Sequence, residues 1–184
     1  ILQTDEDAFE TVDGTLDTSY MYRPLMISKV LLEHCDNDGL FILSNIATKK
    51  NPSEFEKTVL TMAMLYSKAA FTADPMAKLV YILSALESTF LKSESEPIQQ
   101  NLSERMAFFI ANELEKRKEI IKNVKSVYAL RSKYLHHGHS SEEIEQLSKF
   151  FMNVFSLFVK LLKVSGMFKD KNEFLNKIDD IKLS

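Results

Sequence analysis

Apolar residues recur along most of the chain at spacings of three and four, which is the pattern of amphipathic helices. Asn51, Pro52 and Ser53 form a helix-start signal, and the apolar positions that follow with this spacing are Phe55, Val59, Met62, Tyr66 and Ala69. The pattern restarts with Asp74 as the expected N-cap and Pro75 as the first helical residue. This second predicted helix ends at about residue 91 and carries the stripe Leu79, Leu83, Leu86 and Phe90.

The next part of the chain alternates between a polar segment and two further helices. Residues 92–101 are polar and contain Pro97, so we expect a loop there. A third helix is predicted from Ser103 to about residue 116, and a fourth over roughly residues 117–135, with the inner face Ile120, Val124, Val127, Tyr128 and Leu135. Gly138 is expected at its end, because glycine takes the left-handed C-terminal conformation at little steric cost.

A fifth helix is predicted from residue 141 to about residue 164, since Ser140 and Glu143 have the spacing of a capping box. It has two apolar stripes. One stripe comprises Ile144, Phe151, Phe155, Phe158 and Leu162, and the other comprises Leu147, Phe150, Val154, Leu157, Leu161 and Val164. A surface helix of a monomer normally needs one apolar stripe. The second stripe therefore either lies at the centre of a bundle or is covered by another copy of the chain.

Residues 1–50 are less regular. They contain one predicted helix, over residues 22 to about 34, and a short apolar segment, residues 40–46, whose first four residues are the only suggestion of a strand. Gly and Pro are scarce, with four of each. The chain is therefore expected to be all-α.

Length and composition place the chain among single globular units. It has 184 residues, 45% of them apolar, which excludes disorder as the default state. One cysteine, Cys35, cannot form an intramolecular disulfide, and no signal peptide precedes the first helix, so we expect a reducing, cytoplasmic location. The apolar run over residues 150–164 is interrupted by Asn153, Ser156, Lys160 and Lys163, so no membrane span is expected.

Charge is distributed unevenly. The formal net charge of −3 excludes a protein that coats nucleic acid through bulk electrostatics. Residues 1–17 contain six acidic residues and no Lys or Arg, which is typical of a solvated segment. Residues 113–133 contain seven basic and three acidic residues. This run is either a solvated helix face or a surface that holds a phosphate backbone.

Two charged residues interrupt apolar stripes. Glu87 stands on the inner face of the second helix, and Arg131 stands on that of the fourth. An unpaired charge there would cost several kcal/mol, so we expect the two to meet, with Arg105 as the alternative partner of Glu87. Such a pair either fixes helix register without any chemistry or orients a functional arginine.

Three of the four histidines, His136, His137 and His139, lie within four residues. A metal site would need three or four donors, and the available supplements are His34 and Glu142 or Glu143, so no metal is expected. The alternative is acid–base chemistry by an imidazole beside Arg131. On an ideal helix His136 lies about 140° from Arg131. The two converge if the helix loosens towards its end, or if a second subunit contributes its own pair.

Residues 127–138, V-Y-A-L-R-S-K-Y-L-H-H-G, resemble the final signature of HEPN domains, especially of their ApeA-like branch, in which an Arg is followed after four to six residues by a His. Residues 79–90, L-V-Y-I-L-S-A-L-E-S-T-F, are similar to the helix of that branch with its "ALE" element. Residues 102–107, L-S-E-R-M-A, are similar to its "ER-A" element. Many nuclease members have Asn, Asp or His where this chain has Ser132, although Ser also occurs in the ApeA-like branch.

The resemblance implies an antiparallel helical bundle of the HEPN type over residues 51–184, with a small N-terminal extension over residues 1–50. It further implies a homodimer whose Arg and His residues face one cleft, and a metal-independent endoribonuclease that needs no cofactor. The implied catalytic residues are Arg131, His136 or His137, Glu87 and Ser132, and the implied RNA-binding residues are Lys133, Lys125 and Tyr134.

Two functions remain open at this point. The first is RNA cleavage, in which Arg131 holds the phosphate and a histidine transfers the proton, in a toxin or phage-defence effector. The second is a non-catalytic module that binds RNA, a nucleotide or a partner protein, because a fold does not itself establish activity. The chain begins with Ile, and an antitoxin or another domain of a larger polypeptide is a further expected partner.

Overall fold

The computed structural model describes residues 2–3, 9–10, 29–93, 95–134 and 141–183. These residues are all helical apart from a short antiparallel pairing of β1 (Leu2–Gln3) with β2 (Phe9–Glu10) and a few connecting turns. The helices are α1 (Lys29–Asn37), α2 (Leu40–Thr48), α3 (Glu54–Ala70), α4 (Pro75–Phe90), α5 (Ile98–Ile110), α6 (Leu114–Tyr134), α7 (Ser141–Val164), the 3-10 turn η2 (Ser165–Met167) and α8 (Lys171–Leu183).

The starts of α3 and α4 follow directly from their local sequence. Ser53 caps α3 in a reciprocal capping box: its hydroxyl accepts from the Glu56 amide at 3.1 Å, and the Glu56 carboxylate accepts from the Ser53 amide at 2.6 Å. Asp74 caps α4 by accepting from the Ala77 amide at 2.6 Å, with Pro75 as the first helical residue. Both caps satisfy amides that have no partner inside the helix. These two sequence predictions are confirmed.

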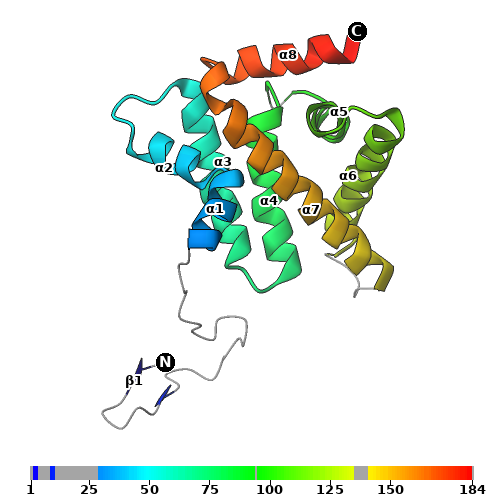
Figure 1. Ribbon diagram of the computed structural model, residues 1–184. Coiled ribbons are helices and arrows are strands. Elements are labelled where there is room, and N and C mark those ends of the chain that lie inside the picture. The colour runs from blue at the N-terminus through cyan, green and yellow to red at the C-terminus, as the bar shows by residue number, and fades with distance from the viewer. Residues whose placement is uncertain (1, 4–8, 11–28, 94, 135–140, 184) are drawn as a thin grey trace.

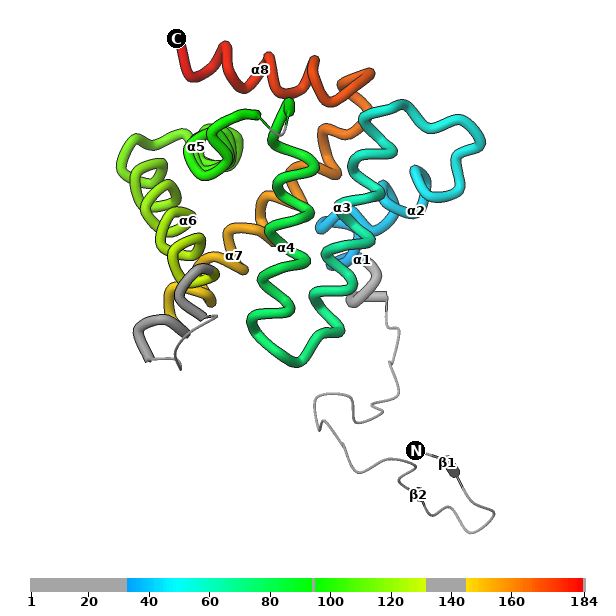
Figure 2. The backbone as a smooth tube through the Cα atoms, turned by 180° about the vertical axis from the view of Figure 1, so that it is seen from behind, coloured from blue at the N-terminus to red at the C-terminus, as the bar shows by residue number. Residues whose placement is uncertain are grey.

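Helices α3 and α4 lie side by side, and α7 crosses them (Figure 1). The pair α5 and α6 lies on one flank, α1 and α2 lie on the other, and α8 runs across one end of the molecule, as the view from behind also shows (Figure 2). Helix α6 contacts α4, α5 and α7.

The two apolar stripes of α7 have different surroundings. Phe150, Val154 and Leu157 of the stripe 147–164 are fully buried, so this stripe belongs to the core. The other stripe is divided. Its C-terminal end is covered by the chain itself, since the Phe158 ring stacks on Tyr66 of α3 and Leu162 lies against Gly39 at the start of α2. Phe155 of the same stripe, in contrast, is 44% exposed. Neither sequence alternative therefore describes the whole helix.

Within the described residues, one segment, Glu145–Met167, is long and apolar enough to cross a membrane by length and composition. The sequence prediction considered only the shorter, interrupted run 150–164. In the fold this segment supplies buried core residues of α7, and the central helix of a soluble protein has the same composition. The length and composition of this segment are therefore only weak evidence for a membrane span.

Three sequence predictions about the helices are wrong. The suggested strand at residues 40–43 is the first turn of α2, so the described part of residues 1–50 contains two helices rather than one. The predicted loop 92–101 ends at residue 97, and in place of the predicted helix 103–116 the structure has α5, which begins five residues earlier at Ile98 and ends at Ile110. The polar first turn of α5 faces solvent, which hides the helix from an apolar pattern.

Side chains of α6 and α7 stabilise the turn between α5 and α6 by binding backbone carbonyls at the end of α5. The Lys160 ammonium of α7 donates to the Phe109 carbonyl at 2.6 Å, and Arg117 of α6 donates to the Ala111 carbonyl at 2.9 Å. These donors satisfy carbonyls that the end of α5 leaves without an intrahelical partner. An interruption between two helices that is stabilised in this way has no signature in the local sequence.

Helix α8 has no counterpart in the sequence predictions. Its Phe174 ring lies in the middle of an aromatic cluster, with ring centroids 4.8 Å from Phe55, 5.6 Å from Phe90 and 5.2 Å from Phe109. Phe174, Leu175 and Ile178 are buried, at the one-and-four spacing of an amphipathic helix. The signal for α8 was therefore present in the sequence.

Candidate functional site

Glu87, Tyr128 and Arg131 come together where α4 and α6 pack against each other. The Tyr128 hydroxyl donates a hydrogen bond of 2.8 Å to Oε1 of Glu87. The Arg131 Nη1 lies 3.6 Å from the same oxygen, which is an ion pair but longer than a hydrogen bond. The sequence prediction that Glu87 and Arg131 meet is confirmed.

The site lies at the edge of the core rather than inside it. The Glu87 side chain is 28% exposed and that of Arg131 is 45% exposed. Glu87 stands in the last turn of α4, where the negative end of the helix dipole disfavours a carboxylate. Arg131 and the Tyr128 hydroxyl compensate for this position. The sequence pattern places both charges on inner faces, whereas the structure places the pair at the edge of the core, where both side chains reach solvent.

The role of Tyr128 was not predicted, because the sequence pattern counts it among the apolar residues of the inner face. Its hydroxyl becomes visible as a functional group only when α4 brings Glu87 opposite. Burial, followed by the hydrogen bond to Glu87, raises the pKa of Tyr128 far above its usual value. The hydroxyl therefore remains protonated and keeps donating at neutral pH.

Several predicted site residues cannot be placed. His136 and His137 lie outside the described residues, as do Gly138 and Ser140, the expected helix end and helix cap. Ser132, Lys133 and Tyr134 belong to the last turn of α6, but their side chains are also outside the described part. The arrangement of Arg131 relative to the histidines stays a prediction.

Lys125 faces a different neighbour from Arg131. Its backbone carbonyl accepts from Gln99 of α5 at 3.1 Å. Burial raises the pKa of Glu104 on α5, but hydrogen bonds from Lys182 and Gln100 lower it overall, and the charge of Lys125 makes the smallest contribution in the same direction. On an ideal helix, six residues separate Lys125 from Arg131 by about 120° and about 9 Å. Lys125 is exposed and lies on a different face of α6 from Arg131, so the structure does not bring these two predicted residues together.

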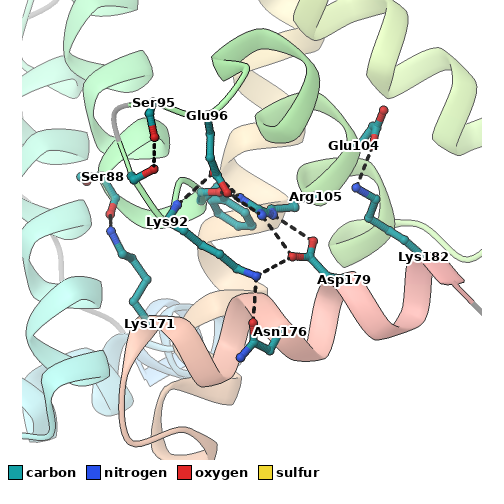
Figure 3. A network of polar contacts seen from close by, with 12 residues as sticks. Ser88, Lys92, Ser95, Glu96, Glu104, Arg105, Lys171, Asn176, Asp179 and Lys182 are labelled. Atoms are coloured by element: carbon teal, nitrogen blue, oxygen red, sulfur yellow. Dashed lines mark hydrogen bonds and ion pairs between the residues drawn. The ribbon is translucent and has the colours of Figure 1, made fainter.

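A second arginine, Arg105 of α5, has a very different environment (Figure 3). Its guanidinium donates to Glu96 at 2.8 and 3.1 Å, to Asp179 of α8 at 3.0 Å twice, and to the Phe90 carbonyl at 2.8 Å. These five bonds match the five donors of a guanidinium. The alternative in which Arg105 pairs with Glu87 is therefore wrong, because Glu96, Asp179 and the Phe90 carbonyl occupy all five of its donors.

The charges of this Arg105 cluster stabilise one another and have a structural role. Burial alone would raise the pKa of Asp179, but hydrogen bonds from Arg105 and Lys92 outweigh it and hold that pKa at about 2. The hydrogen bond from Arg105 likewise lowers the pKa of Glu96. The Arg105 side chain is only 5% exposed. The cluster joins α5, α8 and the segment between α4 and α5, and it leaves no donor for a ligand.

Among the described residues, no three His, Cys, Asp or Glu side chains lie close enough together to hold a metal ion. The histidine cluster and the side chains of Glu142 and Glu143 are not included in that statement. No family model, no curated protein and no solved structure matches this chain. The candidate site therefore rests on its own geometry and on the motifs in the sequence.

The arrangement around Arg131 has a definite chemical capacity. A half-exposed guanidinium presents planar donors that match phosphate oxygens. The same group is anchored on one side by Glu87, so its position is constrained. Arg131 can therefore hold an anionic ligand where α4 and α6 meet. No buried contact has to be broken first, because its pair with Glu87 is partly exposed.

Proposed function

We propose that this protein is an RNA-cleaving domain of the HEPN type, an antiparallel helical bundle in which Arg131 holds the scissile phosphate. The observation that carries the proposal is the exposure and pairing of the Arg131 side chain. Its guanidinium is half-exposed, pairs with Glu87 among the described residues at the long distance of 3.6 Å, and precedes His136 by five positions in the sequence.

The reaction would be a metal-independent transesterification. The RNA 2′-hydroxyl attacks the neighbouring phosphorus, forming the P–O2′ bond while the P–O5′ bond breaks. His136 or His137 removes the proton of the 2′-hydroxyl, and a protonated imidazole donates one to the leaving O5′. Arg131 neutralises the charge that develops on the phosphoryl oxygens. The products are a 2′,3′-cyclic phosphate and a 5′-hydroxyl.

An exposed basic face of α6, which on an ideal helix points about 120–180° away from Arg131, supports an RNA substrate. Lys118, Lys122 and Lys125 recur at a spacing of four and three on the exposed face of α6. Such a face attracts a phosphate backbone in a salt-dependent manner. Lys133 and Tyr134 follow in the same helix, and with Ser132 they complete the proposed set. RNA is favoured over DNA because its 2′-hydroxyl is the nucleophile.

The decisive experiment incubates single-stranded RNA with the protein in EDTA. We expect cleavage in the wild type, no cleavage in Arg131→Ala, and loss in at least one of His136→Ala and His137→Ala. Arg117→Ala is the matched control, because it removes the other arginine of α6 and is expected to retain cleavage. Cleavage that EDTA abolishes would contradict the mechanism and favour a metal site at the histidine cluster.

A second candidate function has an observation of its own. Tyr128 and Arg131 both contact Glu87, which is also how a non-catalytic module would fix the register of α4 against α6. Such a module would bind RNA, a nucleotide or a partner protein. It is favoured if RNA binds without being cleaved, and if the Arg131→Ala variant loses stability rather than activity.

We infer a soluble, cytoplasmic homodimer that acts as a toxin or defence effector, with an antitoxin or another domain of a larger polypeptide as a further partner. Support for the dimer comes from α7, where Met152 and Phe155 are 69% and 44% exposed. Sedimentation at micromolar concentration tests this. A dimer in the wild type that dissociates in Phe155→Asp is expected, and a wild-type monomer would contradict it.

A further inference from the structure

The carboxylate of Glu87 is shared between two donors of α6. Its Oε1 accepts from the Tyr128 hydroxyl at 2.8 Å, and Nη1 of Arg131 lies 3.6 Å from the same atom. Tyr128 and Arg131 are three residues apart, so they lie on one face of the helix about 4.5 Å apart along its axis. One oxygen atom therefore serves a short bond and a long ion pair.

An arginine and a carboxylate that are free to adjust normally form two parallel hydrogen bonds of about 2.7–2.9 Å. The Arg105 cluster shows this arrangement, since Arg105 binds both oxygens of Glu96 and both oxygens of Asp179. Arg131 does not reach it with Glu87. The additional donor to Glu96 and Asp179 is Lys92, which lies outside the helix of Arg105, whereas the additional donor to Glu87 is a tyrosine hydroxyl three residues from Arg131 on the same helix.

The restraint that Tyr128 exerts is permanent under physiological conditions. Burial and the neighbouring carboxylate raise the pKa of Tyr128, so the hydroxyl does not ionise and does not lose its donor function near neutral pH. The ring is half-buried and packs against the core, so the hydroxyl has little freedom to turn away. Glu87 consequently keeps the orientation that Tyr128 imposes.

We propose that Tyr128 is a positioning residue: it holds Glu87 so that Glu87 steers the Arg131 guanidinium without closing on it, which leaves Arg131 open to a phosphate oxyanion. The identity of that oxyanion as an RNA phosphodiester rests on the proposed function. The restraint of Glu87 by Tyr128 does not.

The first test measures the accessibility of Arg131 without any ligand. Phenylglyoxal modifies exposed guanidinium groups, and peptide mapping by mass spectrometry gives the rate at Arg131. In Tyr128→Phe, Glu87 is free to form the closer pair, so modification of Arg131 is expected to slow by about two- to fivefold. In Glu87→Gln the attraction is weakened, and modification is expected to accelerate.

The double variant Tyr128→Phe with Glu87→Gln separates positioning from packing. If Tyr128 acts through Glu87, the double variant modifies Arg131 at the rate of Glu87→Gln alone. The rate at Arg117 in the same digests is the internal control and is expected to stay constant. An unchanged or faster rate in Tyr128→Phe, or additive effects in the double variant, would overturn the proposal.

The second test uses an oligouridylate with 2′-O-methyl groups, which binds but cannot be cleaved. We expect Tyr128→Phe to weaken its binding by about two- to fivefold, in step with the modification rate, and the oligonucleotide to protect Arg131 from phenylglyoxal. If it neither binds nor protects while the modification pattern holds, the RNA function fails and the positioning role stands. If it binds wild type and Tyr128→Phe equally, the positioning role fails and the RNA function stands.

Discussion

Two arginines on neighbouring helices show how the same side chain takes opposite roles. Arg105 is 5% exposed and uses all five of its donors on Glu96, Asp179 and a backbone carbonyl. Arg131 is 45% exposed and, within the described residues, is held by one ion pair of 3.6 Å. Saturation of the donors, rather than the presence of an acidic partner, distinguishes a structural arginine from one that is free for a ligand.

The energetic consequences differ accordingly. A buried charge network is expensive to break, because removing one member leaves the others desolvated and unpaired. An exposed pair contributes little, because water and salt compete with it. Stability should therefore depend strongly on the Arg105 cluster and weakly on Arg131, while ligand binding should depend on Arg131.

The largest expected effect is on Arg105. Arg105→Ala leaves Glu96 and Asp179 unpaired, and it should lower the free energy of unfolding by about 3–5 kcal/mol. Urea denaturation followed by circular dichroism measures this. Arg105→Lys should also be destabilising, because an ammonium cannot bind both carboxylates and the Phe90 carbonyl at once. A loss in Arg105→Ala no larger than that in Arg131→Ala would break the comparison.

Acid should weaken the same cluster. The pKa of Asp179 is about 2 in the folded chain against an ordinary 3.8, so its contribution is complete above about pH 4 and is lost as the pH falls through about 2. The shift corresponds to about 2 kcal/mol in the free energy of unfolding. Glu96, whose pKa is also lowered, contributes in the same direction.

The measurement for this second prediction is urea denaturation between pH 5 and pH 2, with Asp179→Asn as the matched variant. Since asparagine does not titrate, the variant should lose the part of the acid dependence that belongs to Asp179. Identical pH profiles for the two proteins would show that the Arg105 cluster is not what makes the fold acid-sensitive.

A smaller effect is expected at Tyr128. Tyr128→Phe removes a hydrogen bond to a charged group, but Arg131 can take its place, so the free energy of unfolding should fall by about 1 kcal/mol. Urea denaturation of Tyr128→Phe in the wild-type and Glu87→Gln backgrounds gives the coupling energy. No coupling would mean that the tyrosine stabilises only through its ring.

The smallest expected effect is on the stability of Arg131→Ala. We predict a change below about 1 kcal/mol in the free energy of unfolding, because the pair with Glu87 is long and solvent-exposed. Urea denaturation at low and high salt should give nearly the same small difference. A loss comparable to that of Arg105→Ala would assign Arg131 a structural role and favour the non-catalytic module.

Much of the fold was predictable because its signals are local. The caps at Ser53 and Asp74 satisfy amides within three residues, and α7 runs from residue 141 to residue 164 as its spacing indicates. The start of α5 and its early end were not predictable in this way. They depend on a solvent-facing first turn and on Lys160 and Arg117, which bind carbonyls of another helix or of the loop before α6.

The candidate site likewise contains one contact that was predictable from the sequence and others that were not. Two charges on apolar stripes were enough to predict that Glu87 and Arg131 meet, since unpaired charges are costly in a core. The hydroxyl of Tyr128 and the competition of Glu96 and Asp179 for Arg105 were not predictable. Asp179 is separated from Arg105 by 74 residues and belongs to a helix that the sequence predictions omitted.

The sequence by itself determined where α3 and α4 start, which faces of the predicted helices are apolar and which two charged residues must find partners, because each of these follows from spacing within a few turns. Tertiary structure alone decided which partner each arginine takes and how many of its donors remain for a ligand. The reason is geometric: donors and acceptors pair at about 3 Å, and only the packing of distant helices brings them that close.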